Sequence, residues 1–304
     1  MELAKTCLIQ ILIMFILVAV GYLCGRIRMI DKTTNSKLSA FVLDVVNPVL
    51  IFNSYQKEFS VQLLKNLGLA VLLSGASYAL IMIFLRIIYR SDRSSDTVIT
   101  RFAAIYSNCA FMGIPLLNGL FGSEGVMYLT GYITVFNLMV WTHGVALFSK
   151  DGGTDIKKIL RSPSIIAIAV GLICFITQIH IPDIRIQACT HLGNCKTPLA
   201  MICAGVTISF TDIGQYLKSR KVLMAVISRL IICPVMFWAV FRFFPLPETV
   251  FLTVLVASGC PAAATGTMFA LKFDGNSEMS AVVFAATTVL SAITLPLVVM
   301  LGAI

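Results

Sequence analysis

The chain has 304 residues, of which 58% are hydrophobic and 12% are charged, and its mean hydropathy is +0.93. Soluble domains carry about 25% charged residues, so this composition excludes a soluble fold and indicates an all-α integral membrane protein. The formal net charge of +9 would suit a nucleic-acid binder, but the positions of the basic residues argue against one.

Ten apolar stretches follow one another along the chain, with short connections between them. A segment that spans the hydrocarbon core of a bilayer needs about 20 mostly apolar residues, and each stretch approaches or exceeds that length. The sequence therefore predicts ten transmembrane helices. They cover residues 6–23, 37–55, 66–87, 99–120, 126–148, 162–180, 197–212, 222–244, 248–271 and 279–302.

The basic residues favour one side of the membrane. With the N-terminus placed outside, sixteen Lys and Arg residues, Lys272 among them, belong to the cytoplasmic connections. Six, including Arg185 and Lys196, belong to the outer ones. Cytoplasmic loops are enriched in Lys and Arg. The excess of positive charge is thus a topology signal, with both termini outside, and it does not indicate nucleic acid.

The chain divides into two halves of five predicted helices, residues 1–150 and 151–304. Five is odd, so the second half enters the membrane from the opposite side, which is the inverted repeat typical of secondary transporters. The tripeptide Ser107-Asn108-Cys109 resembles Ser258-Gly259-Cys260, which lies 151 residues further along the chain. With this offset Pro115 corresponds to Gly266, so the fourth and ninth helices each carry a predicted break at mid-membrane.

These two breaks predict a binding site for an anion. Broken backbone at membrane depth is tolerated only inside protein or along a water-filled cavity, and glycine and proline interrupt a helix. The half-helix after each break starts with free N–H groups and a positive dipole end. A plain proline kink is the alternative. The predicted binding residues are Asn108, Gly113, Pro115, Thr265, Gly266 and Thr267.

Few ionisable residues lie inside the predicted spans, where they are costly and usually functional. Asp44, about a turn before Pro48, would serve as a proton-coupling carboxylate, accept a hydrogen bond from the substrate, or bond to the backbone freed by the proline. Arg229 would compensate the charge of an anion, pair with a carboxylate, or extend toward the membrane surface. His143 is expected to be a hydrogen-bonded core residue more than a proton relay.

Several motifs in order resemble those of one transporter family. They are N-x-x-x-M-G-I-P-L-L at 108–117, NPVLIF at 47–52, WTHGVAL at 141–147 and CPAAATGTMFA at 260–270. The chain resembles the auxin efflux carrier family, which includes plant PIN exporters and many bacterial members. The resemblance implies a scaffold of helices 1, 2, 6 and 7, a transport domain of helices 3–5 and 8–10, and crossed helices 4 and 9, as in bile acid symporter-like folds.

The resemblance also implies the substrate class, which is a small organic anion such as malate, malonate or an auxin-like acid. Two departures matter. Thr265 and Gly266 stand where many relatives carry asparagine, and the long cytoplasmic loop of the PIN exporters is missing. The second departure favours a bacterial-type carrier in the inner membrane.

The function expected from these features is alternating-access secondary transport. A proton- or sodium-coupled symporter of the bile acid type, or a channel or sensor on the same fold, are the alternatives. No H-E-x-x-H or G-x-S-x-G motif occurs, so neither an enzyme, a metal site nor a cofactor is expected. A homodimer in the lipid is possible, and Cys189 and Cys195 share a predicted outer loop that leaves a disulfide open.

Overall fold

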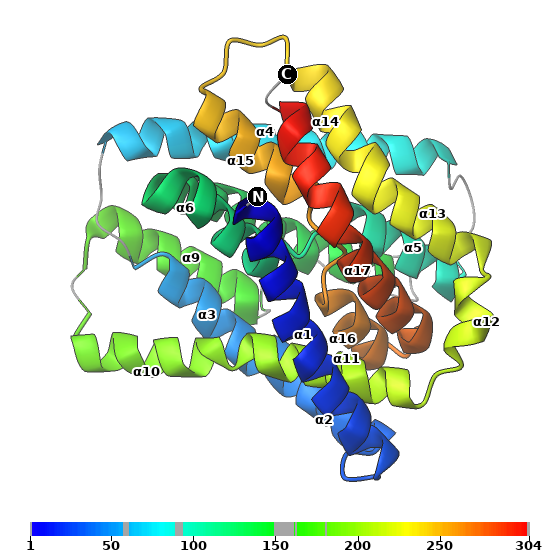
Figure 1. Ribbon diagram of the computed structural model, residues 1–304. Coiled ribbons are helices and arrows are strands. Elements are labelled where there is room, and N and C mark those ends of the chain that lie inside the picture. The colour runs from blue at the N-terminus through cyan, green and yellow to red at the C-terminus, as the bar shows by residue number, and fades with distance from the viewer. Residues whose placement is uncertain are drawn as a thin grey trace.

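The computed structural model describes residues 2–56, 61–88, 94–148, 161, 163–179 and 181–302. Apart from one isolated antiparallel bridge, the regular structure of these residues is helical (Figure 1). The helices of the N-terminal half are α1 (Glu2–Arg26), α2 (Lys32–Phe41), α3 (Asn47–Ser54), α4 (Val61–Ile88), α5 (Ser95–Ile105), α6 (Ile114–Met139) and α7 (Val145–Phe148). Those of the C-terminal half are α9 (Pro163–Thr177), α10 (Asp183–Asn194), α11 (Lys196–Ser209), α12 (Ile213–Leu217), α13 (Arg220–Ile227), α14 (Cys233–Phe241), α15 (Glu248–Gly259), α16 (Thr265–Lys272) and α17 (Ser277–Gly302).

Among the described residues, four π-helical turns continue or join these helices. They are η1 (Val42–Val46), η2 (Cys109–Gly113), η3 (Val140–Gly144) and η4 (Ser228–Ile232). Each of the residues Asp44, His143 and Arg229, which the sequence singles out as ionisable within a span, lies in one of these turns. Single π-helical turns inside α-helices occur frequently at functional sites.

The helices confirm an all-α integral membrane protein. Among the described residues, five helical segments are long and apolar enough to cross a bilayer, and three shorter helices are also apolar. The five segments are 32–53, 65–88, 124–148, 220–241 and 277–302, and the shorter ones are 12–26, 163–177 and 248–259. The arrangement as ten spans in two inverted halves remains a prediction.

Helix α11 is packed tightly against α1. A Cβ atom built on Gly205 would collide with the backbone of Val18, and one built on Gly21 would collide with the backbone of Ile202. Small residues let membrane helices approach this closely, and close packing holds them together where the hydrophobic effect does not. Helix α2 is attached to the same helix, because Asn35 Nδ2 donates to the carbonyl oxygen of Cys203 at 3.1 Å.

The segment before α11 differs from its prediction. Residues 183–194, expected in an outer loop, form helix α10, and α10 and α11 run end to end (Figure 1). Arg185 is therefore helical, and Lys196 begins a buried helix instead of ending a loop. Cys189 and Cys195 are both free thiols, so the open question of a disulfide is answered in the negative.

Candidate functional site

Two helix breaks are hydrogen-bonded to each other at the centre of the site. Helix α5 ends at Ile105 and α15 ends at Gly259, and the chain after each is non-helical for several residues. Ser107 and Ala262 form an antiparallel bridge. The N–H of Asn108 donates to the carbonyl oxygen of Pro261 at 2.7 Å, and the N–H of Ala263 donates to that of Tyr106 at 2.9 Å. The backbone groups freed by one break are thus satisfied by the other, as burial requires.

The breaks lie a few residues away from their predicted positions. Gly113 has helical dihedral angles (φ −71°, ψ −40°), Pro115 lies in the first turn of α6, and Gly266 lies inside α16. Neither Gly113 nor Gly266 therefore interrupts its helix, in contrast to the predicted breaks. In the second half the break is explained by Pro261, which lacks an N–H and disfavours helical backbone at Cys260 (φ −61°, ψ 151°).

Both glycines serve packing instead. A Cβ on Gly266 would approach the ring of Phe102 at 3.1 Å, and one on Gly113 would approach the Leu129 side chain at 3.2 Å. The side chain of Thr267 has a partner within the protein, because its hydroxyl donates to Ser280 Oγ at 3.3 Å. None of the three is among the residues that line the cavity described below.

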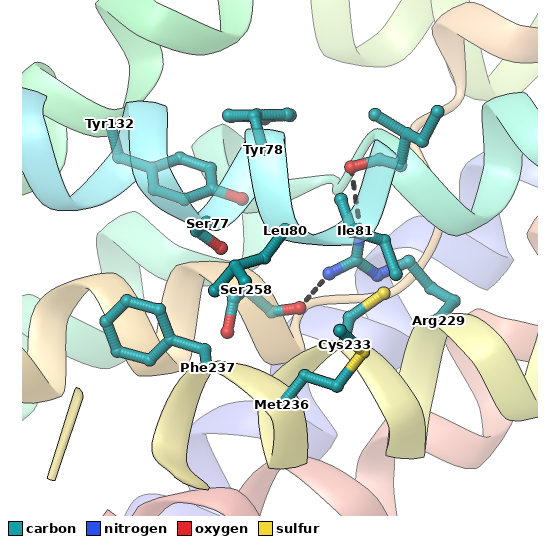
Figure 2. Close-up of a pocket in the computed structure, with 11 residues that line it drawn as sticks. Ser77, Tyr78, Leu80, Ile81, Tyr132, Arg229, Cys233, Met236, Phe237 and Ser258 are labelled. Atoms are coloured by element: carbon teal, nitrogen blue, oxygen red, sulfur yellow. Dashed lines mark hydrogen bonds between the residues drawn. The ribbon is translucent and has the colours of Figure 1, made fainter. Parts of the chain in front are cut away.

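Arg229 joins the C-terminal ends of the two broken helices. It is 1% exposed, and its Nη1 donates to the carbonyl oxygens of Ala104 and Ile105 at 2.9 and 3.0 Å. Its Nη2 donates to the carbonyl oxygen of Ser258 (Figure 2). These carbonyls belong to the last turns of α5 and α15, which have no helical donors of their own. The observed contacts of Arg229 are thus with helix ends and match neither a carboxylate partner nor an exposed, surface-directed side chain.

A small cavity lies beside the breaks. It is lined by Ser107, Asn108, Cys109, Ala110, Phe136, Lys196, Ala200, Ala263, Ala264, Thr265 and Met268. Asn108 is 5% exposed and Thr265 8% exposed. The amide nitrogen of Asn108 and the hydroxyl of Thr265 are buried without a hydrogen-bond partner. A buried donor left unpaired costs free energy, so such groups in a native protein need an explanation.

The helices that start at this cavity also lack side-chain caps. Asn108 is the N-cap residue of η2 and Ala264 that of α16, and neither donates or accepts a capping hydrogen bond through its side chain. Asparagine is among the best N-cap residues, yet here its amide lines the cavity. The starts of η2 and α16 therefore carry the positive ends of their helix dipoles without a side-chain acceptor. In α16 the N–H groups of Gly266 and Thr267 donate to the carbonyl oxygens of Ala263 and Ala264.

Lys196 is a cavity residue that the sequence did not predict. It is 7% exposed and is the first residue of α11. A positional signal was present, because residues 183–196 contain no proline and continue directly into the apolar helix. A helix of that length places Lys196 near its middle and not in a loop.

Asp44 and His143 are not among the described residues that line the cavity. Asp44 accepts from Lys272 Nζ at 2.6 and 2.8 Å, so a charge pair links η1 to the last turn of α16. His143 Nδ1 is 3.0 Å from the hydroxyl of Tyr106. That contact is what a hydrogen-bonded core histidine would make. Pro115 is described here only through its backbone, in the first turn of α6.

Comparison with known proteins gives concordant matches over nearly the whole chain. The model of a family described as "Membrane transport protein" matches residues 6–158 and 152–299. A protein of Methanothermobacter thermautotrophicus described as an uncharacterized transporter is 25% identical over 292 residues, which are 94% of this chain and 95% of that protein. Both matches indicate a membrane transport protein.

Proposed function

This chain belongs to the membrane transport protein family, the auxin efflux carriers that its motifs resemble, and from that premise we propose that it is a secondary transporter of a small organic anion. The anion's carboxylate binds at the paired helix breaks. Among the residues predicted for binding, Asn108 and Thr265 are the side chains that contact it.

The unpaired donors at the cavity carry this proposal. The Nδ2 of Asn108 and the Oγ1 of Thr265 are buried, come from the two different halves of the chain, and line one cavity. A carboxylate accepts several hydrogen bonds at once, so one bound group satisfies both donors. The uncapped first turns of η2 and α16 add positive dipole ends on the same side.

The character of the lining favours an anion over a cation. The described residues that line the cavity include no carboxylate, and their one ionisable basic group is Lys196. A sodium site requires several oxygen ligands of the kind that carboxylates and carbonyls supply. The bile acid type of symporter, with sodium bound at the breaks, therefore fits this cavity less well than an anion carrier does.

The size of the cavity supports a mechanism with a moving part. Its volume is about 20 Å³, roughly the space that a single water molecule needs. Malonate or a larger acid enters only if the lining elements separate. We propose that the broken helices, with helices 3–5 and 8–10 of the predicted spans, move against helices 1, 2, 6 and 7, so that the site opens to each side in turn.

This movement takes place in a bacterial plasma membrane, with both termini outside. In the structure α1 starts and α17 ends on the same side of the molecule (Figure 1), which supports an even number of spans.

The proposal is tested by the variant Asn108→Ala in purified protein reconstituted into liposomes. Malonate, malate and indole-3-acetate are first screened by thermal shift, and any acid that binds is used in counterflow. A hydrogen bond to a charged group is worth about 1.5–3 kcal/mol, so Asn108→Ala should weaken binding about 10- to 100-fold.

Asn118→Ala is the matched control, because Asn118 lies exposed on α6, ten positions further on. It should bind and transport like the native protein. Unchanged affinity in Asn108→Ala would contradict the site. Flux of an acid that binds, without saturation or counterflow, would show a channel instead of a carrier.

A further inference from the structure

The second predicted span makes ion pairs at the end that the basic connections assign to the cytoplasm. The carboxylate oxygens of Asp44 accept from Lys272 Nζ at 2.6 and 2.8 Å, and Lys32 Nζ lies 3.7 Å from Glu278 Oε1. Lys32 begins α2 and Asp44 lies in η1, whereas Lys272 ends α16 and Glu278 lies in the first turn of α17. Both ion pairs thus join the proposed scaffold to the proposed transport domain.

The same span contacts the transport domain at its other end without charge. The hydroxyl of Tyr55 donates to Thr134 Oγ1, on α6, at 3.1 Å. The ring of Tyr55 packs on α9, where a Cβ built on Gly171 would lie 2.6 Å from it, so the residue is fixed to the scaffold. From Asp44 to Tyr55 the span is about 16 Å long, at about 1.5 Å for each residue. The two contacts therefore lie at opposite ends of one span.

Helix α16 connects the cavity to the charged contact. Thr265 is its first residue and lines the cavity, and Lys272 is its last. A helix of eight residues moves as one body, so displacing its start from the scaffold also displaces Lys272 from Asp44. The cavity of about 20 Å³ has room for roughly one water molecule. The structure is therefore an arrangement in which neither side of the membrane has access to the site.

We propose that these contacts are the two gates of the transporter and that they differ in kind. The inner gate is the ion pair of Asp44 and Lys272, supported by that of Lys32 and Glu278. The outer gate is the hydrogen bond between Tyr55 and Thr134. The inference rests on the proposed function and deepens it, because it names the contacts that break when the anion is released to each side.

Both gates are weak enough to open in every transport cycle. The side chains of Asp44 and Lys272 are 38% and 30% exposed, and an ion pair with this exposure shifts an equilibrium by about fivefold at most. A single hydrogen bond between neutral groups has an effect of similar size. Removing one gate therefore changes how often the site opens to one side and leaves the protein folded.

The test measures how fast Cys109 reacts from each side of the membrane. Cys109 is a free thiol, is 1% exposed and lines the cavity, so a membrane-impermeant methanethiosulfonate reaches it only when a gate opens. The full-length protein is labelled in right-side-out and in inside-out vesicles, and modification of Cys109 is measured by peptide mass spectrometry. Asp44→Asn should speed labelling from the cytoplasmic side about two- to fivefold. Tyr55→Phe should speed it from the outer side by a similar factor.

Exchanging the two charges distinguishes a gate from a static surface contact. Lys272→Asp alone should speed labelling from the cytoplasmic side, because Asp44 then faces a second carboxylate. Adding Asp44→Lys to that variant should restore the slow native rate. The matched controls are Lys37→Met and Tyr22→Phe, which alter an exposed lysine of α2 and an exposed tyrosine of α1. Both should be labelled at the native rate from both sides.

The outcomes separate this inference from the proposed function. Native labelling rates in Asp44→Asn or in Tyr55→Phe, or a faster rate from the wrong side, would overturn the two gates. If that happens while Asn108→Ala loses its binding of acids, the inference falls and the function stands. If the gate variants respond as expected while Asn108→Ala binds acids like the native protein, the proposed site falls and the gates stand.

Discussion

Replacing Arg229 by methionine tests the attachment between the two helix breaks. The side chain is 1% exposed and donates to three carbonyl oxygens, two at the end of α5 and one at the end of α15. Hydrogen bonds to charged groups contribute about 1.5–3 kcal/mol each, which gives about 4.5–9 kcal/mol for the three. The substitution also removes the desolvation cost of the buried charge, which is several kcal/mol.

The expected net loss is about 3 kcal/mol or more of unfolding free energy, which is the hydrogen-bond total less the desolvation cost, because three buried carbonyl oxygens lose their donor. At about 2 °C for each kcal/mol in a chain of this size, the melting temperature should fall by at least about 6 °C. The assay is thermal unfolding in detergent, followed by the loss of helical circular dichroism. The melting temperature of Arg229→Lys should lie between those of the native protein and Arg229→Met, because a single ammonium group lacks the planar guanidinium that reaches both helix ends.

Arg242→Met provides the control within the same predicted span. The guanidinium carbon of Arg242 lies 4.2 Å from the centre of the Trp238 ring, and the residue is exposed. Such a contact is worth about 0.5–1 kcal/mol, so the melting temperature should change by about 2 °C or less. Equal melting temperatures for Arg229→Met and the native protein would refute the argument that Arg229 holds the breaks together.

Two further pairs of substitutions test contacts between helices. Asp44→Asn and Lys272→Met, singly or together, should each lower the free energy of unfolding by no more than about 1 kcal/mol, because the two side chains are 30–38% exposed. Thermal unfolding measures this loss. If the double variant loses the sum of the two single losses, the two residues do not interact. Gly205→Leu should push α11 away from α1 and destabilise the protein by about 3 kcal/mol or more. Gly68→Leu is the control and should have little effect, because a Cβ there would meet nothing within 4 Å. If the two variants have the same melting temperature and the same size-exclusion profile, the close approach of α1 and α11 is contradicted.

The features that the sequence predicts well are those that depend on local chemistry. The apolar stretches predict a membrane protein of helices, and the motifs around Asn108 and Pro261 identify the family. Asn108 and Thr265 are polar groups beside the predicted breaks, and both line the cavity. Composition and motif order are sufficient for these inferences, because each one depends only on residues that are close together in the sequence.

The features that the sequence predicts poorly depend on contacts between distant segments. Gly113 and Pro115 stand out as helix breakers, yet the chain leaves the helix at Tyr106, where its carbonyl accepts from Ala263. Nothing local to Tyr106 specifies that partner. Lys196 likewise resembles a loop residue until α10 is seen to precede it as a helix. The three carbonyls that fix Arg229 come from two other helices, so its role depends on packing.

The partial charges at the breaks explain why the proposed anion site would need little formal charge. Each end of a broken helix carries a partial charge of about half a unit, negative at the C-terminus and positive at the N-terminus. The C-terminal ends of α5 and α15 together amount to about one negative charge, and the single positive charge of Arg229 is bonded to both. The starts of η2 and α16 therefore keep about one positive charge that is not cancelled, and they lie at the cavity. Because Arg229 screens the negative ends from the site, an anion there is attracted by both half-helices and repelled by neither.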